Sequence, residues 1–197
     1  MAENDTDQGK RRFLLAATTV ACGGAAGAAA VPFVASMLPS ERAKAAGAPV
    51  EVDISDLQPG QKKIVEWRGK PVWIVHRTPD MMKMIDLDDE KVADPESKRS
   101  EQPAYAKNRI RALKPDYLVV VGICTHLGCS PVDRLTPEPQ PFAADWHGGF
   151  YCPCHGSLFD LAGRVYKNKP APDNLPVPPY KFVGDTKIVI GEDSQGA

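Results

Sequence analysis

Cysteine and histidine gather in two short segments of this 197-residue chain, at spacings that suit metal binding. Four of the five cysteines and two of the four histidines lie in residues 124–129 and 152–157, which read Cys-Thr-His-Leu-Gly-Cys and Cys-Pro-Cys-His-Gly-Ser. Thiolates and imidazoles are the side chains that bind zinc and the irons of iron–sulfur clusters. We therefore predict that the two segments, named here the first box and the second box, together hold a metal centre.

A structural zinc is the first alternative for this centre. Zinc sites usually arrange their ligands in C-x-x-C or H-x₃₋₅-H pairs, and the boxes contain no C-x-x-C pair. They contain instead a C-x-H and a C-x-x-H, with one further cysteine in each box. This arrangement resembles the pair of boxes that defines the Rieske [2Fe–2S] proteins. The resemblance implies that Cys124 and Cys152 bind one iron and that His126 and His155 bind the other.

The resemblance also implies a particular redox chemistry. Two neutral imidazoles in place of two thiolates change the formal charge of the oxidised cluster from about −2 to about zero, which raises the reduction potential. A cluster of high potential can accept an electron from a hydroquinone, and the ring nitrogens that face outward can take up a proton on reduction. His155 and His126 are therefore the expected catalytic residues, and His155 is the better candidate for the proton because of its place in the second box.

The second cysteine of each box separates the subfamilies. Cys129 and Cys154 match the disulfide-forming cysteines of the Rieske subunit of cytochrome bc complexes, whereas Rieske ferredoxins and dioxygenase Rieske domains lack this pair. The resemblance implies a disulfide that ties the two cluster loops together. Two free buried thiols are the alternative.

Other residues near the boxes match the same family. Leu127 resembles the leucine that shields the cluster, and Ser157 resembles the serine whose hydroxyl bonds a bridging sulfide. A plain loop leucine and a turn-capping serine are the alternatives. The stretch 169–172 resembles the proline-rich loop that covers the cluster, although Lys169 stands where the family usually has glycine. Phe159 stands where high-potential members commonly have a tyrosine that bonds a ligand thiolate, here Cys124 by position.

Three residues lie outside this frame: His76 and His147 are expected to be ordinary strand or loop residues, and Cys22, inside the apolar run, a small buried apolar residue.

The N-terminal part predicts a membrane anchor. Residues 13–38 contain no Asp, Glu, Lys, Arg or His, and these 26 residues would form a helix of about 39 Å, enough to cross a hydrocarbon core of about 30 Å. Residues 10–12 are basic and stand directly before the apolar run. Because basic residues next to a membrane helix usually lie on the cytoplasmic side, residues 1–12 are expected to be cytoplasmic. Residues 10–14 resemble a twin-arginine export signal, the alternative being the charged flank of an ordinary membrane helix. The A-x-A of residues 43–45 resembles a cleavage site, but the long apolar run favours an uncleaved anchor.

Residues 39–49 are short and rich in alanine, which predicts a linker that acts either as a hinge or as a passive tether. Residues 50–197 are expected to form the soluble domain. Alternating or continuous apolar residues predict strands at 50–54, 63–67, 71–76 and 117–121, with short strands near 158–160, 180–183 and 187–191. The predicted fold is mainly β: a small antiparallel Rieske-type domain with an inserted cluster-binding subdomain at about 122–180, preceded by one transmembrane helix. The fold of residues 80–114 stays open.

With the anchor, the linker and the second cysteine pair, the resemblance extends to the iron–sulfur subunits of bacterial ubiquinol–cytochrome c reductases. The resemblance implies one [2Fe–2S] cluster per subunit, ubiquinol as the electron donor, cytochrome b and a c-type cytochrome as partners, a dimeric complex, and a head domain that moves between its partners. It places a single-pass anchor in the bacterial inner membrane and the soluble domain in the periplasm. The net charge of −1 gives no basis for binding nucleic acid. A small subunit of an anchored oxidase such as arsenite oxidase and a stand-alone Rieske ferredoxin are the alternatives.

Overall fold

The N-terminal helix begins before the apolar run and ends near its limit. In the computed structural model, which describes residues 7–99 and 101–193, helix α1 spans Gln8–Ser36. The Asp7 carboxylate accepts hydrogen bonds from the backbone N–H groups of Gly9 and Lys10 at 3.0 and 3.2 Å, and this N-cap explains the early start. At 29 residues, α1 is about 44 Å long. A short helix, α2, follows at Glu41–Ala46.

Among the described residues, one helical segment is long and apolar enough to cross a membrane, Gln8–Ala45. None of the residues of α1 is buried. Residues 1–45 and residues 46–197 form two compact units.

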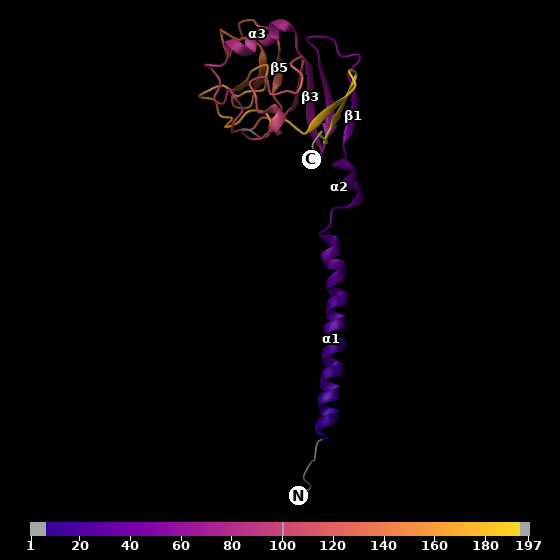
Figure 1. The fold of residues 1–197 in the computed structure, drawn as a ribbon. Coiled ribbons are helices and arrows are strands. Elements are labelled where there is room, and N and C mark those ends of the chain that lie inside the picture. Colours follow the sequence, from indigo (N-terminus) through magenta and orange to yellow (C-terminus); the bar gives the residue numbers. More distant parts are fainter. Residues whose placement is uncertain (1–6, 100, 194–197) are drawn as a thin grey trace. The chain divides into compact units, whose positions relative to one another are not determined.

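The second unit is built from three antiparallel sheets of three strands each (Figure 1). The first has the order β1-β9-β8, with β1 at Val50–Asp53, β8 at Tyr180–Val183 and β9 at Lys187–Ile190. The second has the order β2-β3-β4, with β2 at Lys62–Trp67, β3 at Lys70–His76 and β4 at Tyr117–Val121. The third has the order β5-β6-β7, with β5 at Val132–Arg134, β6 at Gly149–Cys152 and β7 at Ser157–Phe159. The predicted antiparallel, mainly β fold is confirmed.

The segment that the sequence pattern left open contains a helix. Helix α3 spans Pro79–Leu87 and a 3₁₀ turn, η1, spans Ala104–Ala106. Thr78 caps α3 by accepting a hydrogen bond from the Met81 backbone N–H at 3.2 Å, and Pro79 occupies the first turn, where its missing N–H costs nothing. Only Met81 and Ile85 of this helix are buried, which is why no apolar stripe marked it.

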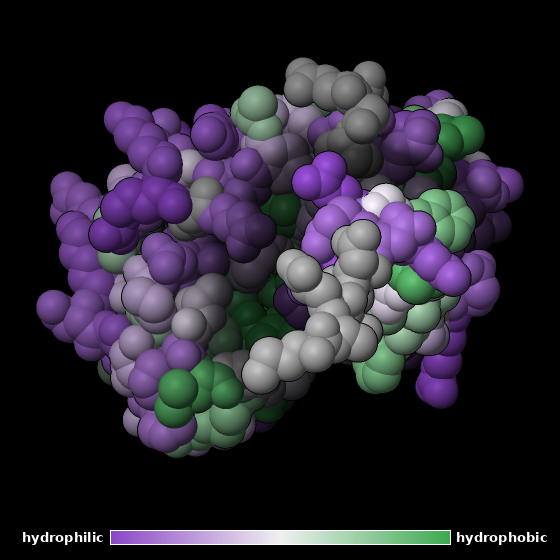
Figure 2. Space-filling view, turned by 90° about the horizontal axis from the view of Figure 1, so that it is seen from below, coloured by the Kyte–Doolittle hydropathy of each residue, from purple (hydrophilic) through white to green (hydrophobic). Residues whose placement is uncertain are grey.

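One hydrophobic core joins the sheets. Trp73 of β3 stacks on Phe150 of β6 with ring centroids 5.0 Å apart, so the second and third sheets pack against each other. Ile188 and Ile190 of β9 and Tyr180 of β8 are fully buried in the same core. On the outside, the space-filling view in Figure 2 shows hydrophilic residues over most of the outline and hydrophobic residues in small patches.

A buried arginine holds α3 and the segment after it against the third sheet. The side chain of Arg164 is fully buried, and its Nε donates to Asp160 Oδ2 at 2.7 Å. Its two Nη atoms donate to Asp89 Oδ1 at 2.7 Å and to the Ile85 carbonyl at 2.6 Å. Asp160 is also fully buried and accepts from the backbone N–H groups of Ala162 and Arg164. Arg164 and Asp160 therefore balance each other's charge inside the protein, and removal of either one would leave the other buried without its partner.

We predict that Arg164→Met lowers the free energy of unfolding of this unit by about 3–5 kcal/mol, because the Asp160 carboxylate is left buried without its cation. Arg109→Met is the matched control. Arg109 binds Asp86 and Asp89 with a side chain that is 39% exposed, so its loss should cost no more than about 1 kcal/mol. Denaturant unfolding followed by tryptophan fluorescence measures both. Equal losses in the two variants would contradict the role given to Arg164.

Candidate iron–sulfur site

The first box follows strand β4 and forms a closed turn. The Gly128 N–H donates to the Cys124 carbonyl at 3.1 Å, and the Cys124 N–H donates to the Cys129 carbonyl at 2.8 Å. Gly128 has a φ of 84°, which favours glycine. Just before the box, a Cβ on Gly122 would lie 2.1 Å from Cε2 of Trp73. Only glycine lets the chain pass this closely over the tryptophan ring on its way to the box.

The second box repeats the same turn between β6 and β7. The Gly156 N–H donates to the Cys152 carbonyl at 3.0 Å, and Gly156 has a φ of 78°. Cys152 is the last residue of β6, and Ser157 is the first residue of β7. The first five residues of each box therefore form a turn that starts on a cysteine and closes on a glycine.

The four predicted ligands divide by burial into an inner and an outer pair. Cys124 and Cys152 are each 2% exposed and both are free thiols. His126 is half-buried and His155 is exposed, and their ring centroids lie 4.7 Å apart with the rings perpendicular. Burial raises the pKa of the Cys152 thiol, and its hydrogen bond with the Cys124 thiol raises it further. The structure thus brings thiol next to thiol and imidazole next to imidazole.

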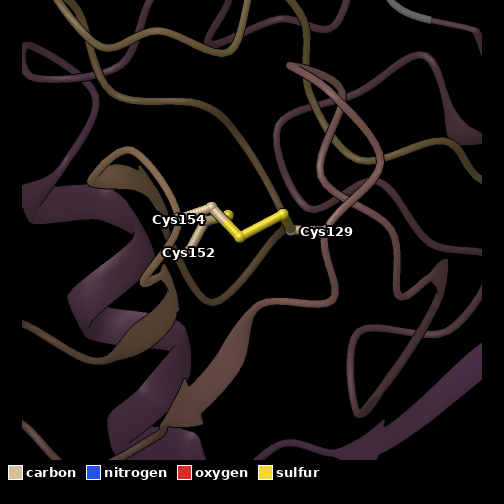
Figure 3. Close-up of side chains that lie close together, drawn as sticks. All are labelled: Cys129, Cys152 and Cys154. Carbon is tan, nitrogen blue, oxygen red and sulfur yellow. A yellow bond between two sulfur atoms is a disulfide. The ribbon is translucent and has the colours of Figure 1, made fainter.

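The second cysteines of the boxes form the predicted disulfide, which is confirmed. Cys129 and Cys154 are bonded, with Cα atoms 6.7 Å apart (Figure 3). The sulfur atoms of Cys129, Cys152 and Cys154 all lie within 4.8 Å of one another. Because two of these three sulfurs are bonded to each other, Cys152 alone of this group offers a free thiol for a metal.

The proline-rich loop at 169–173 binds both boxes. The Thr125 hydroxyl donates to the Asp173 carbonyl at 2.6 Å, and the Ala171 N–H donates to the Ser157 hydroxyl oxygen at 3.0 Å. Lys169 is not among the residues with positive φ, so glycine is not needed there, and the left-handed residue is Asn168, with a φ of 57°. The departure from the family at Lys169 therefore leaves the loop in contact with both boxes. Thr125 was not singled out from the sequence, because its partner lies 48 residues away.

The other predicted residues lie as follows. Leu127 is 72% exposed at the tip of the first box, and Ser157 is fully buried. Phe159 is fully buried in the hydrophobic core that also contains Cys124 and Cys152. Cys22 is an exposed residue of α1.

The two histidines outside the boxes have partners of their own. His76 Nδ1 lies 2.7 Å from the Leu57 carbonyl, and its ring stacks on Tyr117. His147 Nδ1 lies 2.8 Å from the buried Asp88 carboxylate, which also accepts from the Tyr166 hydroxyl at 2.7 Å. His147 thus belongs to a buried polar cluster, which no sequence pattern indicated.

The donor set fits a cluster held by two cysteines and two histidines. The buried thiols of Cys124 and Cys152 lie together, as two ligands of one iron must. His126 Nδ1 is buried and has no hydrogen-bond partner among the described residues. An orphaned buried nitrogen is costly unless it binds something, and a metal would satisfy it. The residues present therefore suit the binding of two irons from two sides.

Comparisons with known proteins indicate a [2Fe–2S] protein. Residues 49–180 match the family model "Rieske [2Fe-2S] domain", and residues 1–40 match the model "Ubiquitinol-cytochrome C reductase Fe-S subunit TAT signal". The ubiquinol–cytochrome c reductase iron–sulfur subunit of Allochromatium vinosum is 55% identical over 197 residues, which cover 100% of this chain and 95% of the relative. The same subunit of Blastochloris viridis is 47% identical, with 97% and 98% covered.

Among solved structures, a chain of "Hyperthermophilic respiratory Complex III" aligns with a TM-score of 0.47 and 28% identity, covering 87% of this chain and 98% of that one.

We predict that Cys129→Ser or Cys154→Ser leaves the four predicted ligands in place but makes the cluster labile, because the boxes lose their covalent link. The measurement is the rate at which the visible absorbance of the cluster disappears at raised temperature, which should increase at least several-fold. Cys22→Ser, the same substitution on α1, should leave the rate unchanged. Equal rates in all three variants would show that the disulfide does not hold the site.

Proposed function

This chain belongs to the Rieske [2Fe–2S] family and, within it, to the iron–sulfur subunits of ubiquinol–cytochrome c reductase. From this premise we propose that it takes one electron and one proton from ubiquinol and passes the electron to a c-type cytochrome. The full-length similarity to named reductase subunits favours this function over an arsenite-oxidase subunit or a stand-alone ferredoxin. The observation that carries the proposal is the division of the site into two buried thiols and two more accessible imidazoles, one half-buried (His126) and one exposed (His155).

In this proposal Cys124 and Cys152 bind the inner iron, and His126 and His155 bind the outer iron. When bound, the cluster supplies a one-electron acceptor of high potential. The buried cysteines keep water away from the inner side. The Ser157 hydroxyl oxygen accepts a hydrogen bond from Ala171, which leaves its own proton to donate toward the site.

His155 is the residue that meets the quinol. Its side chain is exposed, whereas that of His126 is half-buried. An imidazole that binds metal through one ring nitrogen keeps the other for a hydrogen bond, so His155 can accept the quinol hydroxyl and then hold its proton. Leu127, 72% exposed beside the histidines, supplies an apolar surface for contact with cytochrome b.

The N-terminal unit suits a membrane anchor. The Tat signal match and the apolar length of α1 support a segment that reaches the membrane. We place this anchor in the bacterial inner membrane and the second unit in the periplasm, in a dimeric complex with cytochrome b and a c-type cytochrome. Residues 39–49, which include α2, act as the hinge on which the soluble domain moves.

Purification from membranes tests the assignment directly. The tagged full-length chain, extracted in detergent, should bring haem b and haem c with it, and the preparation should reduce cytochrome c with a ubiquinol analogue. Recovery of a molybdenum enzyme, or of the chain alone with no quinol oxidation, would contradict the proposal.

We predict that His155→Cys lowers the midpoint potential of the cluster by roughly 100–300 mV, because one neutral ligand becomes a thiolate. Quinol oxidation should then collapse even where the cluster forms. Redox titration followed by EPR measures the midpoint potential. His147→Cys, the same substitution outside the site, should leave the midpoint potential unchanged. Turnover at the unsubstituted rate in His155→Cys would remove His155 from the mechanism.

We expect proline at both Ala45 and Ala46 to slow turnover without changing the EPR spectrum of the cluster. Proline removes backbone donors of the last turn of α2 and restricts the preceding residue, so the segment loses freedom to change shape. Steady-state cytochrome c reduction is the assay, and glycine at both positions is the flexible control. Unaltered turnover in the proline variant would show that the hinge is not needed.

Phe159→Tyr is expected to raise the midpoint potential. Phe159 shares the buried core with Cys124 and Cys152, and a hydroxyl there can donate to a ligand sulfur, which withdraws electron density and favours reduction. Phe182→Tyr, on a different sheet, controls for the added hydroxyl. An unchanged or lower potential in Phe159→Tyr would contradict this role.

A further inference from the structure

The sulfur of Cys152 lies beside a disulfide that it does not belong to. Cys152 Sγ and the two bonded sulfurs of Cys129 and Cys154 are within 4.8 Å of one another. Figure 3 shows the Cys152 side chain next to this disulfide. A thiol next to a disulfide is the reactant pair of thiol–disulfide exchange, in which the free sulfur attacks one sulfur of the bridge and releases the other. The second box therefore contains an attacking group and a leaving group, with only Pro153 between them.

Binding of the cluster decides whether this pair can react. In the ligand assignment proposed above, the Cys152 sulfur is bound to iron, and a sulfur held by metal is not free to attack. Without the cluster, Cys152 is a free thiol. The leaving group is well placed for release, because Cys154 is exposed while Cys152 is buried. Exchange is thus confined to the cluster-free chain.

We propose that the cluster-free chain undergoes an internal disulfide exchange that moves the bridge from Cys129–Cys154 to Cys129–Cys152. The bond between the sulfurs of Cys129 and Cys154 breaks, a bond forms between the sulfurs of Cys152 and Cys129, and the proton of the Cys152 thiol ends on the Cys154 sulfur. The step is redox-neutral, since one disulfide and one thiol stand on each side, and it needs no oxidant.

Chain geometry favours Cys129 as the new partner of Cys152. A bridge to Cys154 would close a ring over the single residue Pro153, whose fixed φ and extended predecessor limit how far the two sulfurs can adjust. A bridge to Cys129 spans 152 − 129 = 23 positions, against 25 in the native bridge. The entropy of loop closure is therefore almost unchanged.

The consequence of the exchange is a form of the site that cannot bind the cluster. The exchanged chain has lost a predicted iron ligand, Cys152, and has gained an exposed thiol, Cys154. It cannot take up the cluster until the Cys154 thiol attacks the new bridge at the Cys129 sulfur and releases Cys152 again. In an oxidising compartment no external thiol reduces the new bridge, so a chain that has exchanged its disulfide can bind a cluster again only through this reverse step.

Two single-serine variants separate the proposal from general damage. Cys124→Ser and Cys152→Ser each remove one predicted ligand, so neither is expected to hold the cluster. Only Cys124→Ser keeps the three sulfurs of the proposed exchange. The full-length chains are kept in detergent, folded and without added thiol, and then blocked with an alkylating reagent. Near-ultraviolet circular dichroism confirms that both remain folded.

Peptide mapping by mass spectrometry reads out the bridge. Fragments that separate Cys152 from Cys154 at Pro153 show which of the two carries the alkyl group. In Cys124→Ser, and in unsubstituted chain stripped of its cluster by a chelator, the Cys129–Cys152 bridge should exceed its fraction in cluster-loaded chain at least roughly tenfold. Cys152→Ser should contain only Cys129–Cys154. The same chains in concentrated urea should instead give mixed bridges, including bridges to Cys124 where it is present.

The outcomes are distinct. A folded Cys124→Ser chain that keeps only the Cys129–Cys154 bridge overturns the exchange. Mixed bridges in the folded chain also overturn it, because they show unfolding rather than a poised pair. If instead Cys152 is alkylated in the cluster-loaded chain, the ligand assignment fails and the proposed function has to be revised.

Discussion

The two boxes are carried by different strands, and the disulfide between Cys129 and Cys154 is the covalent bond that joins them. The first box follows β4 in the second sheet, whereas the second box connects β6 to β7 in the third. If residues of both boxes bind one cluster, the two boxes must keep a fixed position relative to each other, because iron ligands tolerate little displacement. The hydrogen bonds of loop 169–173 to Thr125 and Ser157 add a second, noncovalent link. The rest of the domain makes these links possible by fixing the strands.

Burial then gives the four predicted ligands different tasks. Cys124 and Cys152 lie within the hydrophobic core, whereas His155 and Leu127 are exposed. A carrier that exchanges electrons with two partners needs a protected cluster and an accessible edge. In the proposed function the buried thiols protect the cluster, and the imidazoles form its accessible edge. The same arrangement underlies the inferred disulfide exchange, because the buried Cys152 thiol is kept from attacking the neighbouring disulfide only while its sulfur binds iron.

The iron–sulfur family and the disulfide could be predicted from the sequence, because the two boxes are local motifs that a known family shares. Strands β2, β3 and β4 were also predictable from apolar runs and alternation. Strands β5 and β6 were missed, since Val132–Arg134 has a single apolar residue and Gly149–Cys152 begins with glycine and does not alternate. Helix α3 has only two buried residues, and the bonds of Arg164 to Asp89 and of Thr125 to Asp173 join segments 75 and 48 residues apart. Local patterns carry no signal for such contacts.

The central claim is that two histidines of the boxes bind one iron. Pulsed EPR of the reduced full-length chain, grown with ¹⁵N-labelled histidine, measures the nitrogens that couple to the cluster. The account predicts couplings from two histidine nitrogens, and it predicts that they persist in a chain with His76→Asn and His147→Asn, which leaves only the two box histidines of the four in the sequence. A cluster with no coupled histidine nitrogen, or couplings lost in the double variant, would contradict it.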